Sequence, residues 1–321
     1  MKELLATFER EQQRINMLLE KECLALSDTV RPVAAHILQA GGKRLRPLLT
    51  VFTGRAFGVE SEDMDMLAIM GELVHMASLL HDDVYDNAGM RRGVASAHRV
   101  FGSVPAMLSG DAIVGHAARR VARLDRPDII SCFSEAIYHT AVGEVAEFAR
   151  LGDVNLDYDA YLDIIRGKTA WALRAACEGA ALLAGADAVM TDAAATFGME
   201  LGIAFQIVDD ALDIAPETVT GKPAGGDIRE GKCTPPVHFY WQSLKGGEAD
   251  DFARKFKERS LSAREVESVL EAMRARGLDA KTRELADTHL GRAEDMLRLL
   301  PPGPGRDILV KVPEFIRTRN F

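Results

Sequence analysis

The chain lacks the motifs of several common enzyme classes. It has no G-x-S-x-G nucleophile turn, no H-E-x-x-H zinc helix and no G-x-x-x-x-G-K-[ST] phosphate loop, so neither nucleophile-and-base chemistry nor nucleoside triphosphate binding is indicated. Its four cysteines show no CxxC or other metal-ligand spacing. They are therefore expected to be reduced, mostly packed thiols of a cytoplasmic protein.

Long apolar runs and an excess of positive charge are also missing. No uninterrupted apolar run reaches the roughly 18–20 residues of a membrane span, and the charged N-terminal segment has no apolar signal core, so stable membrane insertion is not expected. The net charge of −9 argues against nucleic acid as a partner. With 321 residues, 47% of them hydrophobic, and no linker or shift in composition, the chain is expected to form one domain over residues 1–321.

Helical character dominates the sequence. Ala, Leu, Glu, Arg and Met are abundant, whereas alternation of β-branched residues is scarce. Apolar residues recur at helical spacing over residues 66–80 and again over residues 201–212. Helices that are apolar on most sides belong inside a protein. The sequence therefore predicts an all-α fold.

Two copies of the pattern Asp-Asp-x-x-Asp are the most informative feature. Each copy follows an apolar stretch and precedes basic residues; the aspartates are Asp82, Asp83 and Asp86, and Asp209, Asp210 and Asp213. Crowded carboxylates repel one another, and burial strengthens the repulsion. A shared hard cation relieves it, and Mg²⁺ prefers a few carboxylate oxygens together with water and substrate phosphates. The two motifs therefore predict Mg²⁺ sites.

Polar residues extend each motif along its predicted helix. His75, Ser78, Asp82 and Asp86 stand at offsets of 0, 3, 7 and 11, and Gln206 precedes the second motif in a similar way. Positions spaced in this manner lie on one side of a helix. A polar stripe on an interior helix needs partners. A cavity filled with water or ligand would supply them.

Basic residues accompany the acidic motifs in four clusters. The flexible pair Gly41-Gly42 is followed by Lys43, Arg44 and Arg46, and the first motif is followed by Arg91 and Arg92. Lys168 lies within a helical segment, and Lys222 and Lys232 lie on the loop after the second motif. Arginine and lysine bind phosphate groups well. Together with the aspartates they indicate a site for two polyanions, one held through metal ions and one by cations. Such a site is suited to polarising a diphosphate leaving group.

These segments resemble the trans-isoprenyl diphosphate synthases, or polyprenyl synthetases. The matching segments run from Gly41 to Pro236 in the family's order; they are GGKRLRP, HMASLLHDDVYDNAGMRRG, GDAIVGHA, GKTA, AFQIVDDALDI and GKPAGGDIREGKCTPP. The tail VPEFIRTRNF is similar too. The resemblance implies antiparallel helices around a deep central cavity (the isoprenoid synthase fold), a homodimer, and head-to-tail condensation of isopentenyl diphosphate onto an allylic diphosphate.

The resemblance also implies roles for individual residues. The Mg²⁺ ligands would be Asp82, Asp86 and Asp209, with support through water or hydrogen bonds from Asp83, Asp210 and Asp213. These six aspartates and Lys168 would form the catalytic set. The allylic diphosphate would be contacted by Arg91, Lys168, Thr169, Gln206, Lys222 and Lys232. Isopentenyl diphosphate would be held by Lys43, Arg46, His75 and Arg92, whereas Arg44 would make no substrate contact.

Ala77 and Ser78, one turn before Asp82, are expected to control the length of the product. The growing chain should pass along this helix, and two small residues leave the path open. The expected product is therefore a long-chain all-trans polyprenyl diphosphate, and Ala77→Phe should shorten it. The alternative interpretation is that both residues only permit close helix packing.

Other functions compete with this interpretation. A short-chain synthase would share every motif, and a terpene cyclase would share the first motif but have no use for the GGKRLRP segment. Glu72 and His75 have the Glu-x-x-His spacing of di-iron bundles, although a second such pair is missing, so Glu72 is expected to have a packing or hydrogen-bonding role. A regulatory subunit that has kept the motifs is a further possibility.

Overall fold

The structure, a computed structural model, describes residues 2–155, 157–220 and 223–319. Its residues form two compact units. Unit 1 comprises Met1–Ile137, Ala175–Ala194 and Leu300–Leu309, and unit 2 comprises Tyr138–Arg174, Ala195–Leu299 and Val310–Phe321. Three helices contribute residues to both units: α7 (Pro127–Ala149), α9 (Trp171–Leu183) and α10 (Ala188–Asp213).

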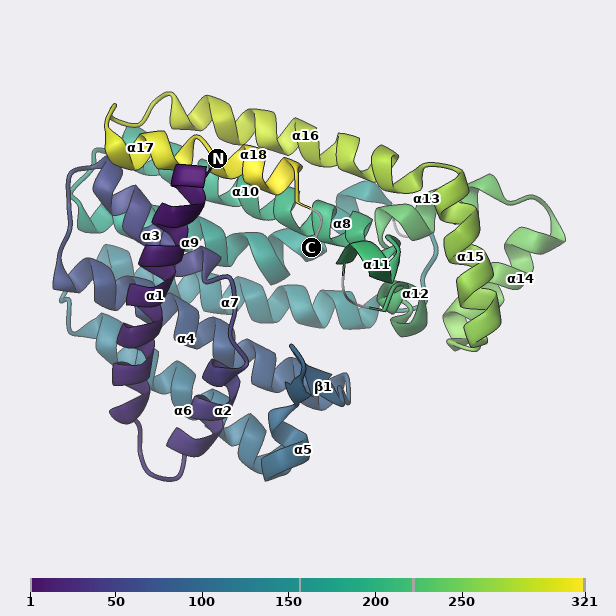
Figure 1. Ribbon diagram of the computed structural model, residues 1–321, viewed down its shortest axis with the longest axis horizontal. Coiled ribbons are helices and arrows are strands. Elements are labelled where there is room, and N and C mark those ends of the chain that lie inside the picture. The colour runs from purple at the N-terminus through teal and green to yellow at the C-terminus, as the bar shows by residue number, and fades with distance from the viewer. Residues whose placement is uncertain (1, 156, 221–222, 320–321) are drawn as a thin grey trace. The chain divides into compact units, whose positions relative to one another are not determined.

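Unit 1 is built mainly from the N-terminal helices (Figure 1). Its elements are α1 (Lys2–Leu24), α2 (Arg31–Gln39), α3 (Leu45–Ala56), α4 (Glu62–Tyr85), β1 (Met90–Arg91), β2 (Val94–Ala95), α5 (Ala97–Phe101), α6 (Ser103–Ala122) and α17 (Pro304–Leu309). The most extensive packing joins α4 to α6 and α3. These contacts make α4 the central helix of the unit.

The sequence of α4 explains its start and its central position. The side chain of Ser61 accepts a hydrogen bond from the backbone N–H of Met64 at 3.1 Å, which satisfies one of the unpaired donors at a helix N-terminus. Leu73 and Leu80 are completely buried, as the apolar periodicity predicts. Burial of each such side chain stabilises the fold by roughly 1.5–3 kcal/mol.

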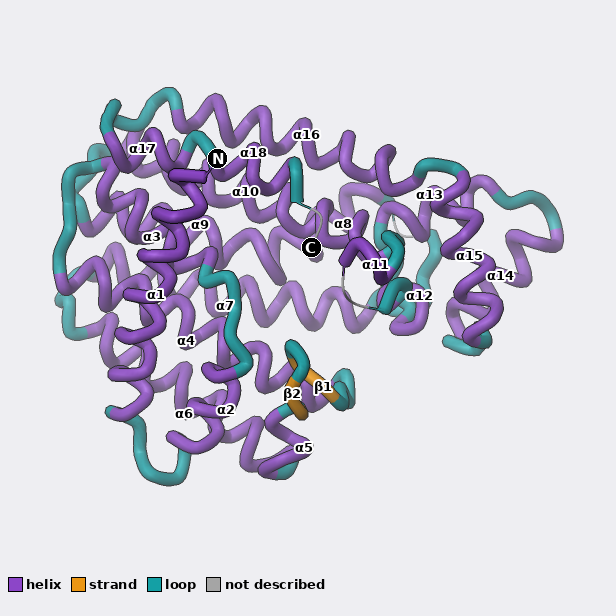
Figure 2. Tube along the Cα trace, in the orientation of Figure 1, coloured by secondary structure: helices purple, strands orange, loops and turns teal. Residues whose placement is uncertain are grey.

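A short hairpin directly follows the first acidic motif. Strands β1 and β2 pair in antiparallel register, with Met90 opposite Ala95 and Arg91 opposite Val94, and Figure 2 shows this pair in orange among purple helices. Arg92 and Gly93, at the turn, both have positive φ angles, a conformation that glycine adopts without strain. The hairpin fixes the positions of two predicted phosphate-binding arginines.

Unit 2 contains the C-terminal helices. Its elements are α8 (Tyr158–Ile165), the π-helical turn η1 (Arg166–Ala170), α11 (Glu217–Thr220), α12 (Gly226–Glu230), α13 (Pro235–Ser243), α14 (Gly247–Glu258), α15 (Ala263–Ala275), α16 (Leu278–Leu297) and α18 (Val312–Arg317). Within it, α16 packs on α13, α15 and α18. The turn η1 carries Lys168 and Thr169, and π-helical turns are frequent at functional sites.

One helix in the described part of the chain, α10, is long and apolar enough to cross a membrane by length and composition alone. Half of its most apolar window is buried inside the structure. Cys23, Cys177 and Cys233 are also buried, in agreement with the predicted packed thiols. The prediction of a single domain stays a prediction, as does the deep central cavity.

Candidate active site

The first acidic motif ends α4, and its three aspartates have different surroundings. Asp83 is buried at 1% exposure and accepts hydrogen bonds from Arg91 at 2.8 Å to Nε and 2.5 Å to Nη2. Asp82 is half-buried and accepts a hydrogen bond from the hydroxyl of Tyr85 at 2.9 Å. Asp86 is the C-cap of the helix and is exposed. Asp83 therefore positions Arg91 of the hairpin. Asp82 and Asp86, the two predicted metal ligands of this motif, remain accessible.

The predicted polar stripe is the accessible side of α4. His75, Ser78 and Asp82 are half-buried, whereas Ala77 is completely buried. The hydroxyl of Ser78 donates a hydrogen bond to the carbonyl of His75 at 2.9 Å. Ser78 thus lies on the same side as the motif and Ala77 on the packed side.

A cluster of cations lies beside this stripe in unit 1. Burial lowers the pKa of His75 well below its ordinary value, and the nearby guanidinium groups of Arg46 and Arg92 lower it further. Burial also lowers the pKa of Arg46, and the Nε of Arg46 is buried without a hydrogen-bond partner in the described residues. Mutual repulsion and an orphaned donor are the features that a bound anion would relieve.

The glycine pair and the hairpin meet at this cluster. Arg92 donates a hydrogen bond to the carbonyl of Gly41. A Cβ atom added to Gly42 would lie 2.5 Å from Nη1 of Arg92, so a side chain at this position would collide with the guanidinium. The close approach explains why glycine stands here. The predicted isopentenyl diphosphate residues Arg46, His75 and Arg92 are therefore brought together, and Lys43 on the adjoining loop is exposed.

Arg44 and Glu72 form a buried ion pair. Nη1 of Arg44 lies 2.9 Å from Oε1 of Glu72, and the two side chains are 2% and 3% exposed. Arg44 also donates hydrogen bonds to Asn16 at 2.9 Å and to the carbonyl of Leu38 at 3.3 Å. Its donors are committed to the fold. The predicted hydrogen-bonding role of Glu72 is confirmed, and the absence of a substrate contact for Arg44 stays a prediction.

The second acidic motif ends α10 in unit 2. Asp209 is half-exposed, and Asp210 is buried at 5% exposure. Burial raises the pKa of Asp210 to about 7 against the lowering effect of hydrogen bonds from Tyr161 and Gln206. Burial likewise raises the pKa of Asp213, which accepts hydrogen bonds from the backbone N–H groups of Gly226 at 2.9 Å and Asp227 at 3.1 Å. Asp213 therefore anchors the loop that follows the motif.

A hydrogen-bonded chain links Asp210 to η1. Thr169 donates to Oε1 of Gln206 at 2.9 Å, and Nε2 of Gln206 donates to Oδ1 of Asp210 at 2.8 Å. The hydroxyl of Tyr161 donates to Oδ2 of Asp210 at 2.5 Å. The predicted residues Thr169 and Gln206 are thus brought to the motif, and Tyr161 is an additional partner that no sequence pattern indicated.

Lys168 and Lys232 are held by acidic residues of α7 and α12 that sequence reasoning missed. Nζ of Lys168 lies 2.9 Å from Glu144 and 2.7 Å from Glu147. Nζ of Lys232 lies 3.7 Å from Glu147 and 2.7 Å from Glu230. Burial would lower the pKa of Lys168, but Glu147 and Glu144 raise it to about 12. Both lysines are therefore charged, and the i, i+3 spacing of the two glutamates was the available signal.

Two further charged residues adjoin the second motif. Burial raises the pKa of Asp227 well above its ordinary value, and Asp213 and Asp210 raise it further. Nη2 of Arg319 lies 2.6 Å from Oδ1 of Asp209, and its guanidinium lies 4.4 Å from the centre of the Phe205 ring. Sequence reasoning missed both residues, although Asp227 lies in the matched loop. Lys222 lies outside the described residues.

The residues of the second motif fit a divalent cation. Burial and mutual repulsion raise the pKa values of Asp210, Asp213 and Asp227, and a nearby dication would favour their ionised forms. Among the described residues no group of three or more His, Cys, Asp or Glu side chains is arranged to hold a metal ion alone. The ion would need oxygens from water and substrate as well, which is the usual situation of Mg²⁺.

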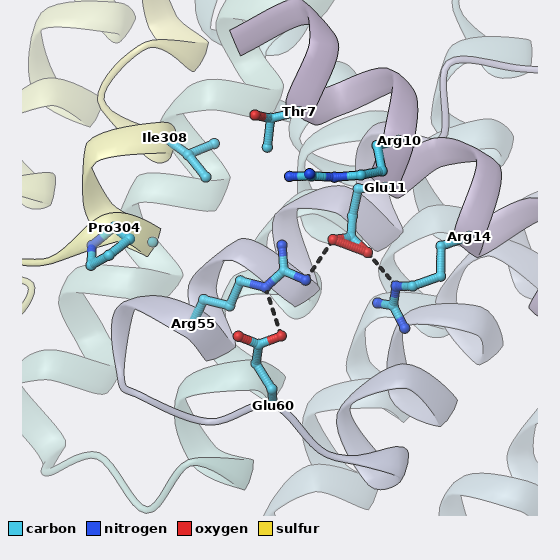
Figure 3. A pocket seen from close by; sticks show the side chains of 9 residues that line it. Thr7, Arg10, Glu11, Arg14, Arg55, Glu60, Pro304 and Ile308 are labelled. Carbon is cyan, nitrogen blue, oxygen red and sulfur yellow. Dashed lines mark hydrogen bonds and ion pairs between the residues drawn. The ribbon is translucent and has the colours of Figure 1, made fainter. Parts of the chain in front are cut away.

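A cavity of about 510 Å³ in unit 1 is lined by none of the predicted site residues. Figure 3 shows Glu11 between Arg14 and Arg55, with Arg55 also directed at Glu60. Burial alone would raise the pKa of Glu11, but hydrogen bonds from Arg14 and Arg55 outweigh it and lower the pKa. Because Glu11, Arg14, Arg55 and Glu60 already pair with one another, the charges drawn in Figure 3 stabilise the packing of α1, α3 and α17 around this cavity.

Aspartate motifs at two helix ends, with arginines and lysines beside them, suit a helical enzyme of diphosphate chemistry, and comparison with known proteins agrees. A family model for polyprenyl synthetase matches residues 27–273. The octaprenyl diphosphate synthase of Escherichia coli (strain K12) is 34% identical over 88% of this chain and 87% of its own length. The chain belongs to the polyprenyl synthetase family.

Solved structures agree with this assignment. A decaprenyl diphosphate synthase from Rhodobacter capsulatus matches with a TM-score of 0.91 and 30% identity, over 100% of this chain and 99% of the other. A polyprenyl synthase from Caulobacter crescentus, complexed with calcium and isoprenyl diphosphate, matches with a TM-score of 0.92 and 33% identity, over 99% of this chain and 97% of the other. The predicted all-α isoprenoid synthase fold and the enzyme class, a trans-prenyltransferase, are confirmed.

Proposed function

We propose that the protein condenses isopentenyl diphosphate with an allylic diphosphate and releases a long-chain all-trans polyprenyl diphosphate. The observation that carries the proposal is the set of three carboxylates that meet at the second motif, of which Asp210 is buried and Asp213 and Asp227 are half-buried. Asp210, Asp213 and Asp227 all have raised pKa values, which suits a site completed by a metal-bound diphosphate. The long-chain products named for the relatives support the chain length.

Mg²⁺ would be held by Asp82 and Asp86 of the first motif and by Asp209 of the second. When bound, it would act as a Lewis acid that stabilises the negative charge of the departing diphosphate. Lys168 and Lys232 remain charged in their glutamate pairs and would add positive charge to the same leaving group. Binding of the diphosphate would compete with those glutamates for the ammonium groups.

The cationic cluster of unit 1 would hold isopentenyl diphosphate. Arg46 offers a buried Nε without a partner in the described residues, and His75 and Arg92 lie beside it. An arginine binds phosphate oxygens through two parallel hydrogen bonds. The double bond of isopentenyl diphosphate would attack the allylic cation, and the released diphosphate would accept the proton, so no protein nucleophile is required.

Ser78 and Ala77 would set the length of the product. Ser78 is accessible on the same side of α4 as Asp82, so a larger side chain here would obstruct a growing chain directly. Ala77 is completely buried, so a larger side chain there would act by displacing its neighbours. The small size of both residues supports a long product.

A homodimer in the cytoplasm is the proposed state. Within unit 2, α7 exposes an apolar stripe at helical spacing formed by Tyr138, Val142, Val145 and Phe148, with exposures of 63%, 44%, 70% and 67%. Within unit 1, α6 exposes Val104, Met107 and Leu108. Exposed apolar patches of this kind mark protein interfaces. A second copy would cover them, and size measurement of the pure protein in solution tests this.

Product analysis by mass tests the proposed activity. The pure protein is incubated with isopentenyl diphosphate, Mg²⁺ and one allylic primer at a time. The expected result is a ladder of masses that grows by one isoprene unit and ends at a long chain. Incubation with an allylic diphosphate alone is the control. Productive consumption of that single substrate would indicate a terpene cyclase instead.

A further inference from the structure

Glu147, in the part of α7 that belongs to unit 2, is shared by the two lysines that are proposed to bind diphosphate. Its Oε2 accepts a hydrogen bond from Nζ of Lys168 at 2.7 Å and lies 3.7 Å from Nζ of Lys232. The side chains of Glu147 and Lys232 are each 20% exposed, and that of Lys168 is 22% exposed. Burial would lower the pKa of each lysine, and Glu147 is the strongest of the groups that raise it. The two ammonium groups therefore depend on one carboxylate.

A crossing of two backbones fixes Glu147 beside Lys168. A Cβ atom added to Gly143 would lie 2.2 Å from the backbone nitrogen of Lys168, and one added to Gly167 would lie 2.8 Å from Cα of Gly143. Only glycine leaves room for an approach this close, so the two glycines allow α7 to touch η1 directly. Glu147 follows Gly143 by one helical turn and is therefore on the same side of α7 as the crossing.

The backbone also ties the segment of Lys232 to the end of α7. The N–H of Gly152, three residues beyond α7, donates a hydrogen bond to the carbonyl of Gly231 at 2.7 Å. The N–H of Lys232 donates to the carbonyl of Asp227 at 2.8 Å. Because both lysines are attached through the backbone to the helix that carries Glu147, their positions around this carboxylate are fixed by the fold.

The charge of Glu147 acts on the second acidic motif as well. Burial is the main cause that raises the pKa of Asp210, and the negative charges of Asp209 and Glu147 raise it further. An anion bound by Lys168 and Lys232 would meet Glu147 in two ways. It would compete for the N–H donors that Glu147 now accepts from, and its negative charge would be repelled by the carboxylate.

We propose that Glu147 is a positioning residue that holds both lysines in place between reaction cycles and weakens the retention of the released diphosphate. The inference rests on the proposed function, because it requires that Lys168 and Lys232 bind the diphosphate. Each condensation releases one diphosphate, and a long product needs many condensations. A carboxylate that takes back the two ammonium groups therefore favours the departure of the diphosphate in every cycle.

Chemical labelling tests the pairing without any assumption about function. Acetic anhydride reacts only with the unprotonated amine, and peptide mass analysis measures the rate at Lys168 in the full chain without metal. Glu147→Gln should raise this rate about ten-fold, because each unit by which the pKa falls increases the unprotonated fraction ten-fold. Glu271→Gln, at an exposed position of α15, is the matched control and should leave the rate unchanged. An equal rate in Glu147→Gln would overturn the pairing.

The retention is measured as the affinity for inorganic pyrophosphate in the presence of Mg²⁺, by isothermal titration and as the inhibition constant in prenyl transfer. Glu147→Gln should bind pyrophosphate about ten-fold more tightly, since hydrogen bonds to charged groups contribute strongly to affinity. Its KM for the allylic diphosphate and its turnover rate should both fall, whereas damage to the fold would raise the KM. Glu147→Asp keeps the charge and should restore the wild-type affinity, and Glu271→Gln should not change it.

The outcomes separate this inference from the proposed function. Pyrophosphate binding by Glu147→Gln that is equal to or weaker than that of the wild-type chain would overturn the role of Glu147 and leave the proposed function standing. Absence of pyrophosphate binding by the wild-type chain in Mg²⁺ would end the proposed function and the retention role together. Tighter binding in Glu147→Gln, reversed in Glu147→Asp, is the result that supports the inference.

Discussion

Removal of the Arg319 side-chain charge should strengthen Mg²⁺ binding. The Nη2 atom of Arg319 is 2.6 Å from Oδ1 of Asp209, the proposed metal ligand of the second motif. The tail is held in this position because Arg283 donates hydrogen bonds to the carbonyls of Arg317 and Arg319 at 3.3 and 3.0 Å. An incoming dication must therefore displace a positive charge from its ligand.

The size of the effect follows from the exposure of the pair. A hydrogen bond to a charged group contributes about 1.5–3 kcal/mol when it is buried, and an exposed ion pair contributes about 0–1 kcal/mol. The side chain of Arg319 is 6% exposed, but that of Asp209 is 48% exposed, so a value of about 1 kcal/mol is reasonable. Arg319→Gln should then raise the Mg²⁺ affinity about five-fold.

Isothermal titration of Mg²⁺ in the presence of pyrophosphate measures this change. Arg317→Gln is the matched control, because Arg317 in the same C-terminal segment pairs with Asp287, Glu294 and Glu314 instead of the motif. Its Mg²⁺ affinity should equal that of the wild-type chain. An unchanged or weakened affinity in Arg319→Gln would refute the competition between the arginine and the metal.

Three further changes have expected outcomes. Glu72→Gln removes one charge of a buried ion pair and should lower the free energy of unfolding in urea by about 3 kcal/mol. Mg²⁺ affinity at the second motif should rise as the pH increases through about 7, because burial keeps Asp210 protonated and neutral below its raised pKa. Tyr161→Phe removes a hydrogen bond that lowers this pKa, so in this variant the rise in affinity should occur at higher pH. Ala77→Phe should shorten the product in mass analysis, and Ser78→Phe should do so without loss of thermal stability; an unchanged length distribution in both would refute the assigned path of the chain.

Features encoded over short stretches of sequence were predictable. The burial of Leu73 and Leu80 and the accessibility of Asp82 follow from helical periodicity alone. The cationic cluster was predictable in part, because Arg46 and the glycine pair are neighbours in sequence. The hydrogen-bonding role of Glu72 was also predicted, although Arg44 was not identified as its partner.

Contacts between distant residues were not predictable in the same way. Tyr161 and Asp210 are 49 positions apart, Lys168 and Glu147 are 21 apart, and Arg319 and Asp209 are 110 apart. No local pattern specifies which distant side chain meets a motif, because tertiary packing makes that choice. The sequence also does not reveal that Lys168 and Lys232, the two lysines proposed to bind phosphate, pair with carboxylates.

The most direct test of the central claim is prenyl transfer by Asp82→Asn and Asp209→Asn. Each is assayed with isopentenyl diphosphate, farnesyl diphosphate and Mg²⁺, beside Asp63→Asn and Asp192→Asn, which change exposed aspartates on the same two helices. The motif variants should lose about 100-fold or more of the turnover rate, because a bound metal ion contributes several kcal/mol to the stabilisation of charge, while their thermal unfolding and both control variants stay normal. Near-normal turnover in a folded motif variant would contradict the account.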